Sequence, residues 1–258
     1  MKSYYFVFNN GELLLERCND KGYNIPCQAM PPTETKPWTN IIEVGEINGI
    51  SVKCYKAENT TYDTERYETC PLRQSYYKLE QDLYLMAGKC AELIYWDINT
   101  KYCGVCGGLM RHHTNISKRC EECGKEVWPQ LATAVIVLIR KDDKILLVRA
   151  LNFKRNFYGL VAGFVETGET LEEAVMREAK EETGLIINNI KYFGSQPWPY
   201  PCGLMIGFTA DYVSGEIKIQ EEELAKAEWF GKDNLPPIPE KLSIARMLID
   251  SWLKEEQK

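Results

Sequence analysis

Residues 163–185 constrain the fold of this chain more than any other stretch. They fit the pattern Gly-x5-Glu-x7-Arg-Glu-U-x-Glu-Glu-x-Gly-U, in which x is any residue and U is apolar. Thr170 followed by Glu173 has the form of a capping box, and Gly184 suits the left-handed position that follows a helix. The sequence therefore predicts a helix over residues 171–183.

Three glutamates share one face of that predicted helix. Glu178, Glu181 and Glu182 are three and four residues apart, and such residues are neighbours on a helix surface. Like charges at this spacing repel one another, so the cluster is either a solvated acidic face or a site for divalent cations. The fixed offsets of Gly163 and Arg177 favour the second interpretation, and carboxylate oxygens suit Mg²⁺ or Mn²⁺.

Four cysteines predict a second metal site. They form two C-x2-C pairs, Cys103 with Cys106 and Cys120 with Cys123, separated by thirteen residues. Four thiolates at this spacing are typical of a structural Zn²⁺ site, whereas a redox role needs only one such pair. Tight turns are predicted at Gly104, Gly107 and Gly124. A basic edge keeps open a nucleic-acid-binding role for this zinc ribbon, although a structural role is favoured; it comprises Arg111, His112, His113, Lys118 and Arg119.

Composition limits the remaining functions. The 258 residues suffice for about two domains, and the net charge of −6 gives no general attraction for polyanions. Neither a signal peptide nor a membrane span is expected. Ten cysteines without a secretory signal favour reduced thiols and a cytoplasmic protein. The two histidines, His112 and His113, both lie in the ribbon, so carboxylates with metals must carry any acid–base chemistry.

Residues 1–98 are predicted to form a small α+β domain, followed by the zinc ribbon at residues 99–130. Hairpins are expected at Asn10-Gly11 and Asn48-Gly49, and a helix over residues 79–97. Cys18, Cys27, Cys54 and Cys70 lack metal-ligand spacing and are interpreted as ordinary thiols.

Residues 131–258 are predicted to form the domain that holds the acidic helix. A hairpin over 132–150 and a strand over 158–165 precede that helix, and strands near 190–193, 204–212 and 227–230 follow it. Residues 235–239 are too rich in proline to be regular. A final helix over 240–254 places Ile244, Met247, Leu248 and Trp252 on one side. This order predicts a mixed sheet in an α/β/α sandwich.

The pattern at residues 163–185 is the Nudix box, and the chain resembles Nudix hydrolases. Residues 195–203 read Ser-Gln-Pro-Trp-Pro-Tyr-Pro-Cys-Gly, which resembles the SQPWPFPxS element of the NADH pyrophosphatase (NudC-type) branch. That branch also carries a four-cysteine ribbon before its Nudix domain, and the resemblance covers about residues 73–256. Three positions depart from it: Tyr200 replaces Phe, Gly203 replaces Ser, and Trp128 replaces Tyr.

The resemblance implies roles for individual residues. Glu178, Glu182, Glu223 and the backbone carbonyl of Ala162 would hold the catalytic Mg²⁺ or Mn²⁺, with Glu221 and Glu222 as neighbouring alternatives to Glu223. Glu181 would act as general base or metal ligand, and Arg177 would orient the acids. The residues implied to bind substrate are Trp128, Phe164, Gln196, Pro197, Trp198, Pro199, Tyr200, Pro201, Cys202, Gly203, Ala245 and Arg73.

The resemblance also implies a reaction, hydrolysis of NADH or NAD to NMN(H) and AMP. The same cleavage would remove NAD caps from RNA 5′ ends, and the enzyme would be a homodimer. The departures at Gly203 and Trp128 leave open ADP-ribose or another dinucleotide as substrate. A non-enzymatic alternative is a zinc-ribbon adaptor for nucleic acid, which the intact acidic set of the box argues against.

Overall fold

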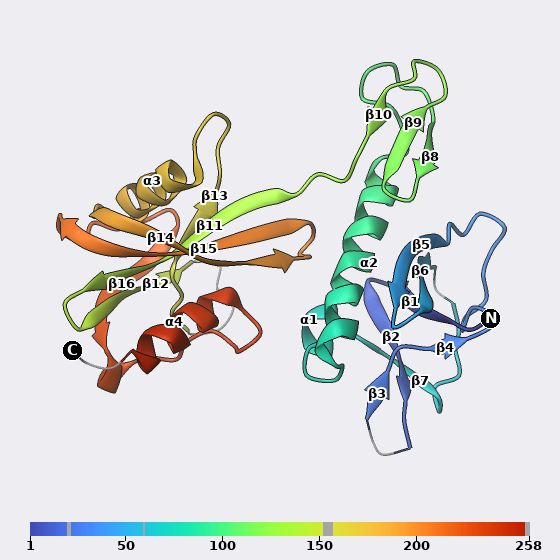
Figure 1. Cartoon of the computed structure of the whole chain (residues 1–258), viewed down its shortest axis with the longest axis horizontal. Helices are drawn as coiled ribbons and strands as arrows, with labels where there is room; N and C mark the ends of the chain where they lie inside the picture. Colours follow the sequence, from blue (N-terminus) through green and yellow to red (C-terminus); the bar gives the residue numbers. More distant parts are fainter. Residues whose placement is uncertain (20–21, 59, 152–156, 256–258) are drawn as a thin grey trace. The chain divides into compact units, whose positions relative to one another are not determined.

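The computed structural model describes residues 1–19, 22–58, 60–151 and 157–255. The chain divides into two compact units (Figure 1). The first contains Met1–Gln130 together with the short segment Pro199–Cys202, and the second contains Leu131–Trp198 and Gly203–Lys258. None of the helices in the described ranges combines the length and the apolar character needed to cross a membrane.

A seven-stranded sheet forms the centre of the first unit, with the order β3-β2-β1-β6-β5 and with β4 and β7 paired to β1 and β2. Both predicted hairpins are present, because Asn10, Gly11, Asn48 and Gly49 all have positive φ. The strands are β1 (Ser3–Asn9), β2 (Glu12–Arg17), β3 (Tyr23–Asn24), β4 (Cys27–Gln28), β5 (Ile42–Ile47), β6 (Ile50–Ala57) and β7 (Tyr67–Cys70).

Helix α2 (Gln81–Asn99), which follows the short α1 (Leu72–Ser75), covers one face of this sheet. Leu83, Ala87 and Cys90 of α2 share a buried core with Phe6 and Leu13 of the sheet. The predicted helix over 79–97 is confirmed with a shift of two residues at each end. Cys54 and Cys70 are buried and Cys18 and Cys27 half-buried, as expected of ordinary thiols.

The ribbon is a three-stranded sheet of β8 (Met110–Thr114), β9 (Ser117–Cys120) and β10 (Glu126–Val127). It is anchored on the last turns of α2. The buried Lys118 ammonium lies 2.7 Å from Asp97 Oδ1 and donates to the Asp97 backbone carbonyl at 2.7 Å. Because the Lys118 ammonium is buried in this contact, Lys118 packs the ribbon against α2 and does not contribute to a basic edge.

The second unit is an α/β/α sandwich, as predicted. Its mixed sheet has the order β14-β15-β11-β12-β16, with β13 paired to β11. The strands are β11 (Ala132–Lys141), β12 (Lys144–Ala150), β13 (Val161–Phe164), β14 (Ile186–Trp198), β15 (Gly203–Ser214) and β16 (Leu224–Gly231). Strands β11 and β15 run parallel, whereas the other pairs are antiparallel.

Alternation along β11 supplies both cores of the sandwich. Val135, Val137 and Ile139 pack with α3 (Leu171–Thr183), and Ile136 and Leu138 pack with α4 (Ile244–Lys254). Figure 1 shows the two helices on opposite faces of the sheet. Because successive strand residues point to opposite faces, one apolar run serves two layers.

Two predicted boundaries were wrong. Helix α4 begins at Ile244 and not at residue 240, because the Ser243 hydroxyl accepts a hydrogen bond from the Arg246 N–H and caps the helix there. The 3₁₀ turn η1 (Lys232–Asn234) precedes it in the chain. Met247 is exposed, so it is not on the buried side of α4. Strand β14 extends to Trp198 and includes Pro197, which an edge strand tolerates.

Candidate metal centre and active site

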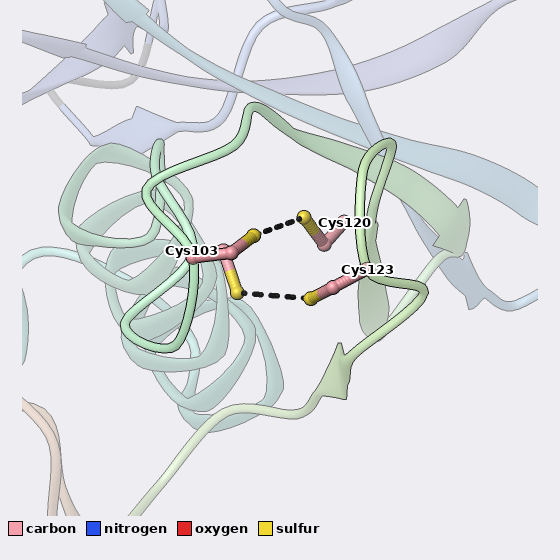
Figure 2. A group of neighbouring side chains, drawn as sticks. Cys103, Cys120 and Cys123 are labelled. Carbon is pink, nitrogen blue, oxygen red and sulfur yellow. Dashed lines mark hydrogen bonds between the residues drawn. The ribbon is translucent and has the colours of Figure 1, made fainter.

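The four ribbon cysteines converge on one point (Figure 2). Their sulfur atoms all lie within 4.8 Å of one another, with Cys103 Sγ 3.6 Å from Cys123 Sγ and Cys106 Sγ 3.4 Å from Cys120 Sγ. A tetrahedral zinc site with bonds of about 2.3 Å separates its sulfurs by about 3.8 Å. The cysteines therefore fit a structural Zn²⁺.

The two halves of this centre repeat one turn. Gly107 N–H donates to the Cys103 carbonyl at 2.9 Å, and Gly124 N–H donates to the Cys120 carbonyl at 3.1 Å, both with positive φ. Gly104 lies within the first of these turns, as predicted, although its own φ is not positive. Backbone N–H groups of Cys106 and Val105 donate to the Cys103 thiol and lower its pKa to about 6. Such donors favour the thiolate, which is the form that binds metal.

The basic edge predicted for the ribbon is largely neutralised. Arg111 pairs with Glu121 at 3.1 Å, and Arg119 pairs with Glu126 at 3.0 Å. His112 Nε2 lies 2.7 Å from Asp97 Oδ1. Since Lys118 is buried against the same Asp97, four of the five residues of the predicted edge are paired with carboxylates.

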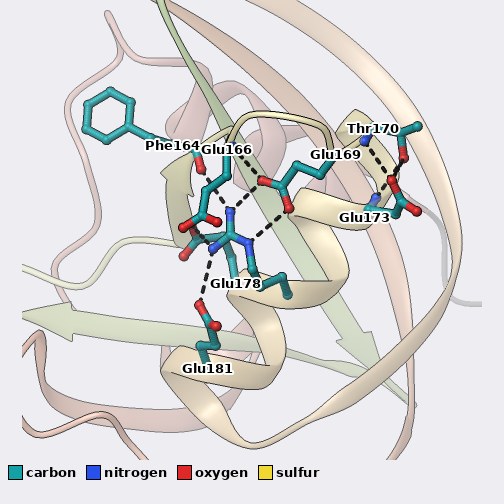
Figure 3. A network of polar contacts seen from close by, with 8 residues as sticks. Phe164, Glu166, Glu169, Thr170, Glu173, Glu178 and Glu181 are labelled. Atoms are coloured by element: carbon teal, nitrogen blue, oxygen red, sulfur yellow. Dashed lines mark hydrogen bonds and ion pairs between the residues drawn. The ribbon is translucent and has the colours of Figure 1, made fainter.

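In the second unit, the Arg177 guanidinium contacts most members of the Nudix-box network, whose glutamates are labelled in Figure 3. It donates to both carboxylate oxygens of Glu169, at 2.7 and 3.0 Å, and to the Phe164 carbonyl at 2.9 Å. It also donates to Glu178 Oε1 at 2.9 Å and to Glu181 Oε2 at 3.2 Å. This paired contact lowers the pKa of Glu169 to about 2. Arg177 thus fixes the acids of α3 to the end of β13.

Local hydrogen bonds and a glycine fix the two ends of α3, the helix that carries Arg177. The capping box is formed, because the Thr170 hydroxyl accepts from Glu173 N–H while the Glu173 carboxylate accepts from Thr170 N–H. Gly184 takes the left-handed position, with φ 74°, and ends the helix as predicted. Glu166 N–H donates to Glu169 at 2.7 Å and closes the loop between β13 and α3.

Gly163 allows the closest approach in the site. A Cβ placed there would lie 2.0 Å from Glu178 Oε1, so only glycine lets this carboxylate lie against β13. Ala162, whose carbonyl is a predicted metal ligand, is the adjacent residue of the same strand. Burial raises the pKa of Glu178 even though Arg177 opposes the shift.

Glu182 and Glu223 complete the acidic set. Burial raises the pKa of Glu182 to about 8, and the charges of Glu178 and Glu223 act in the same direction. Glu223 is exposed and follows a loop that is tied to the end of α3, since Gln220 N–H donates to the Glu182 carbonyl at 3.0 Å. Buried carboxylates of one sign with raised pKa values fit a divalent cation, which would favour their charged forms.

The predicted substrate residues are divided between the two units. Arg73 lines a cavity of about 620 Å³ in the first unit together with Pro199, Tyr200 and Pro201. Lys56 lines the same cavity and was not predicted, because nothing in its local sequence marks it. Trp128 is half exposed in the first unit, and Phe164 is 66% exposed at the end of β13 in the second.

Gln196, Ala245 and Gly203 have structural contacts within the second unit. The Gln196 amide donates to the Leu242 carbonyl and accepts from Ile244 N–H, both at 2.7 Å, so it holds the start of α4. Ala245 is buried in that helix. A Cβ on Gly203 would lie 3.0 Å from the Trp198 carbonyl oxygen, so the serine of the family element would be crowded here.

No role was predicted for Glu169, although the Nudix box fixes a glutamate at this position. The pattern fixes a glutamate six residues after Gly163, and an arginine eight residues further on is its partner. That pairing crosses from a loop to a helix, so helical spacing alone does not reveal it. Sequence periodicity likewise gives no sign of the contact between Glu178 and Gly163.

Comparison with known proteins identifies the family. Residues 128–250 match the model for the NUDIX domain, and residues 2–96 match the model for the NADH pyrophosphatase-like rudimentary NUDIX domain. Among solved structures, a NUDIX hydrolase from Nitrosomonas europaea superposes with a TM-score of 0.48 and 22% identity, over 55% of this chain and 85% of that chain.

Curated relatives give the stronger evidence. A protein named NAD-capped RNA hydrolase NudC from Klebsiella pneumoniae (strain 342) is 39% identical over 81% of this chain and 79% of its own length. The protein of the same name from Pseudomonas aeruginosa (strain LESB58) is 43% identical over 71% of this chain and 66% of its own, so the match spans just under two thirds of that relative. The chain therefore belongs to the Nudix hydrolases, in the branch of the NudC-type NADH pyrophosphatases.

Proposed function

We propose that this protein hydrolyses the pyrophosphate bond of NADH or NAD in a metal-dependent reaction that gives NMN(H) and AMP. The observation that carries the proposal is the buried pair Glu178 and Glu182, whose pKa values are raised beside Glu223. Relatives named NAD-capped RNA hydrolase support the choice of an NAD-containing substrate, including the NAD cap of RNA.

The acids divide the work by burial. Glu178 and Glu182 are buried and, with Glu223 and the Ala162 carbonyl, would hold Mg²⁺ or Mn²⁺. A bound divalent cation screens the phosphate charges and acidifies the attacking water. The Glu181 side chain is 55% exposed, so it can reach a water and accept its proton. Arg177 positions Glu178 and Glu181 through the two hydrogen bonds from its Nη1.

Substrate contacts follow the exposed aromatic and cationic groups. In the second unit, Phe164 offers an exposed ring face for the nicotinamide. In the first unit, Trp128 offers an exposed ring, and Lys56 and Arg73 line a cavity together with Pro199–Pro201. Further parts of the proposal are a Zn²⁺ in the ribbon and a homodimer. All ten cysteines are free thiols, which supports a cytoplasmic location.

Charge-removing variants test the acidic site. Glu178→Gln and Glu182→Gln should each lower kcat on NADH at least about 100-fold, because the isosteric amide removes a metal ligand without removing volume. Glu172→Gln is the matched control, since Glu172 is an exposed glutamate in the first turn of the same helix. Full turnover by Glu178→Gln, with the protein folded, would refute the assignment.

The substrate is tested by comparing kcat/KM for NADH, NAD, NAD-capped RNA, ADP-ribose and a diadenosine compound, each with Mg²⁺ and with Mn²⁺. The proposal expects the NAD-containing substrates to lead. A preference for ADP-ribose would favour the alternative that Gly203 and Trp128 leave open. Inactivity on every pyrophosphate, together with tight RNA binding, would favour the adaptor.

A further inference from the structure

The segment Pro199–Cys202 interrupts the second unit in sequence but packs with the first. Tyr200 is partly buried and packs against the hydrophobic core that α2 forms with the sheet. Its hydroxyl lies 3.1 Å from the hydroxyl of Tyr84, in the first turn of α2. One turn further along α2, Gly88 faces Pro199.

Tyr84 is itself held in place. It is buried, and the ring of Tyr76 meets it edge-on with centroids 5.3 Å apart. Burial is the main cause that raises the pKa of Tyr200, so this hydroxyl stays neutral and bonds as a neutral group. The two hydroxyls satisfy each other, and removing either one leaves a polar group without that partner.

Gly88 shows a second, independent fit. After proline, glycine is the least favourable residue in a helix interior, and Gly88 lies well inside α2 and is buried. A Cβ at Gly88 would lie 3.0 Å from Pro199 Cγ and 3.6 Å from Pro199 Cβ. The absence of a side chain at Gly88 therefore leaves room for Pro199 to pack against the helix.

We infer that Tyr84 and Gly88 of α2 are positioning residues for the substrate segment, and that they fix the Pro199–Pro201 wall of the cavity that Arg73 also lines. The inference rests on the proposed function, because it takes this segment to contact the dinucleotide. It also assigns a role to the hydroxyl that distinguishes Tyr200 from the Phe of the family element: that hydroxyl bonds α2, so it need not meet substrate.

The test is a set of kinetic measurements on the intact protein with NADH. Tyr84→Phe should raise KM about 3- to 10-fold and change kcat less than about twofold, since one net hydrogen bond that orders the binding wall is lost. Tyr200→Phe should have a similar effect. The double variant should be no worse than either single one, because each single variant already removes the hydrogen bond that joins the two side chains. Tyr102→Phe is the matched control, a tyrosine that is 70% exposed on the ribbon.

Gly88→Ala gives an answer that does not depend on a hydroxyl. Alanine favours the helix, so the melting temperature should stay equal or rise, while KM should rise because Pro199 is displaced. Unchanged KM in both Tyr84→Phe and Gly88→Ala would overturn the inference, as would strictly additive tyrosine variants. Such results with an active wild type leave the proposed function standing. A wild type that cleaves no dinucleotide would overturn both.

Discussion

Among the acids that line the proposed metal site, Glu182 has the most strongly shifted pKa. Its carboxyl is buried and shares its surroundings with two other glutamates, which together raise its pKa from 4.5 to about 8. A glutamate in water is almost fully charged at neutral pH, whereas the raised pKa of Glu182 favours its protonated form. Ionisation of Glu182 therefore lowers the stability of the folded protein, and a bound cation would offset this loss.

This shift predicts a pH-dependent stability. Because the folded pKa is higher than the unfolded one, the contribution of Glu182 is complete below pH 4.5 and is lost as pH rises through about 8. Glu182→Gln mimics the protonated form, so it should lose less stability between pH 6 and 9. We expect its Tm at pH 9, without added Mg²⁺ or Mn²⁺, to exceed that of the wild type by about 2–4 °C, a gain of about 1 kcal/mol.

Melting curves at several pH values would measure the difference. Glu172→Gln should follow the wild type throughout, because Glu172 is exposed. If the curves of Glu182→Gln and the wild type stay parallel from pH 6 to 9, the raised pKa is wrong.

At the scale of elements, local signals predicted α3 and distant contacts decided the rest. Thr170, Glu173 and Gly184 lie next to the helix that they delimit, so both ends of α3 were predicted correctly. The far end of β14 depends on pairing with β15 across three register shifts, which no short pattern contains. The hydrogen bonds of Gln196 could not be predicted from a short pattern either, because its partners Leu242 and Ile244 lie far along the chain.

The ribbon is the element whose order would depend most directly on the proposed zinc ion. Its core contains little beyond Cys103, Met110 and Cys120, so four thiolates without zinc would have few apolar contacts to hold them. Cys106→Ser should lose the single zinc per chain and lower the Tm by roughly 5 °C, about 2 kcal/mol. Elemental analysis and melting curves would show both effects.

A thiol outside the ribbon provides the control. Cys18→Ser changes a half-buried cysteine that follows β2 and should keep the zinc. Zinc retained in full by Cys106→Ser would contradict a four-cysteine site.

At the scale of the whole molecule, the chain has two sets of cores that share no residues. The cores of the first unit surround β1 and β6, and those of the second surround β11. Length predicted about two domains, the spacing of the cysteines predicted the ribbon, and the order of strands and helices predicted the sandwich. The membership of Pro199–Cys202 could not be predicted, because it rests on a core that lies more than a hundred residues earlier in the chain.

Separate cores predict separate responses to metals. In calorimetry, Mn²⁺ should raise the transition of the second unit, whereas removing zinc should lower that of the first. At a free Mn²⁺ concentration of 100 times its Kd, the stabilisation is about 2.7 kcal/mol. Glu178→Gln should abolish the Mn²⁺ effect and leave the zinc effect. A single transition that responds to both metals alike would show one cooperative unit.

The placement of Pro199–Cys202 also bears on synthesis of the protein. Tyr200 packs against the core around α2, so the contacts of the first unit are incomplete when its first 130 residues have left the ribosome. The Tyr84–Tyr200 contact joins residues 116 positions apart, and such distant pairing is slow to form. The packing site for Tyr200 on α2 must therefore stay unoccupied until most of the catalytic unit has emerged. The last step in the folding of the N-terminal half then depends on the domain that follows.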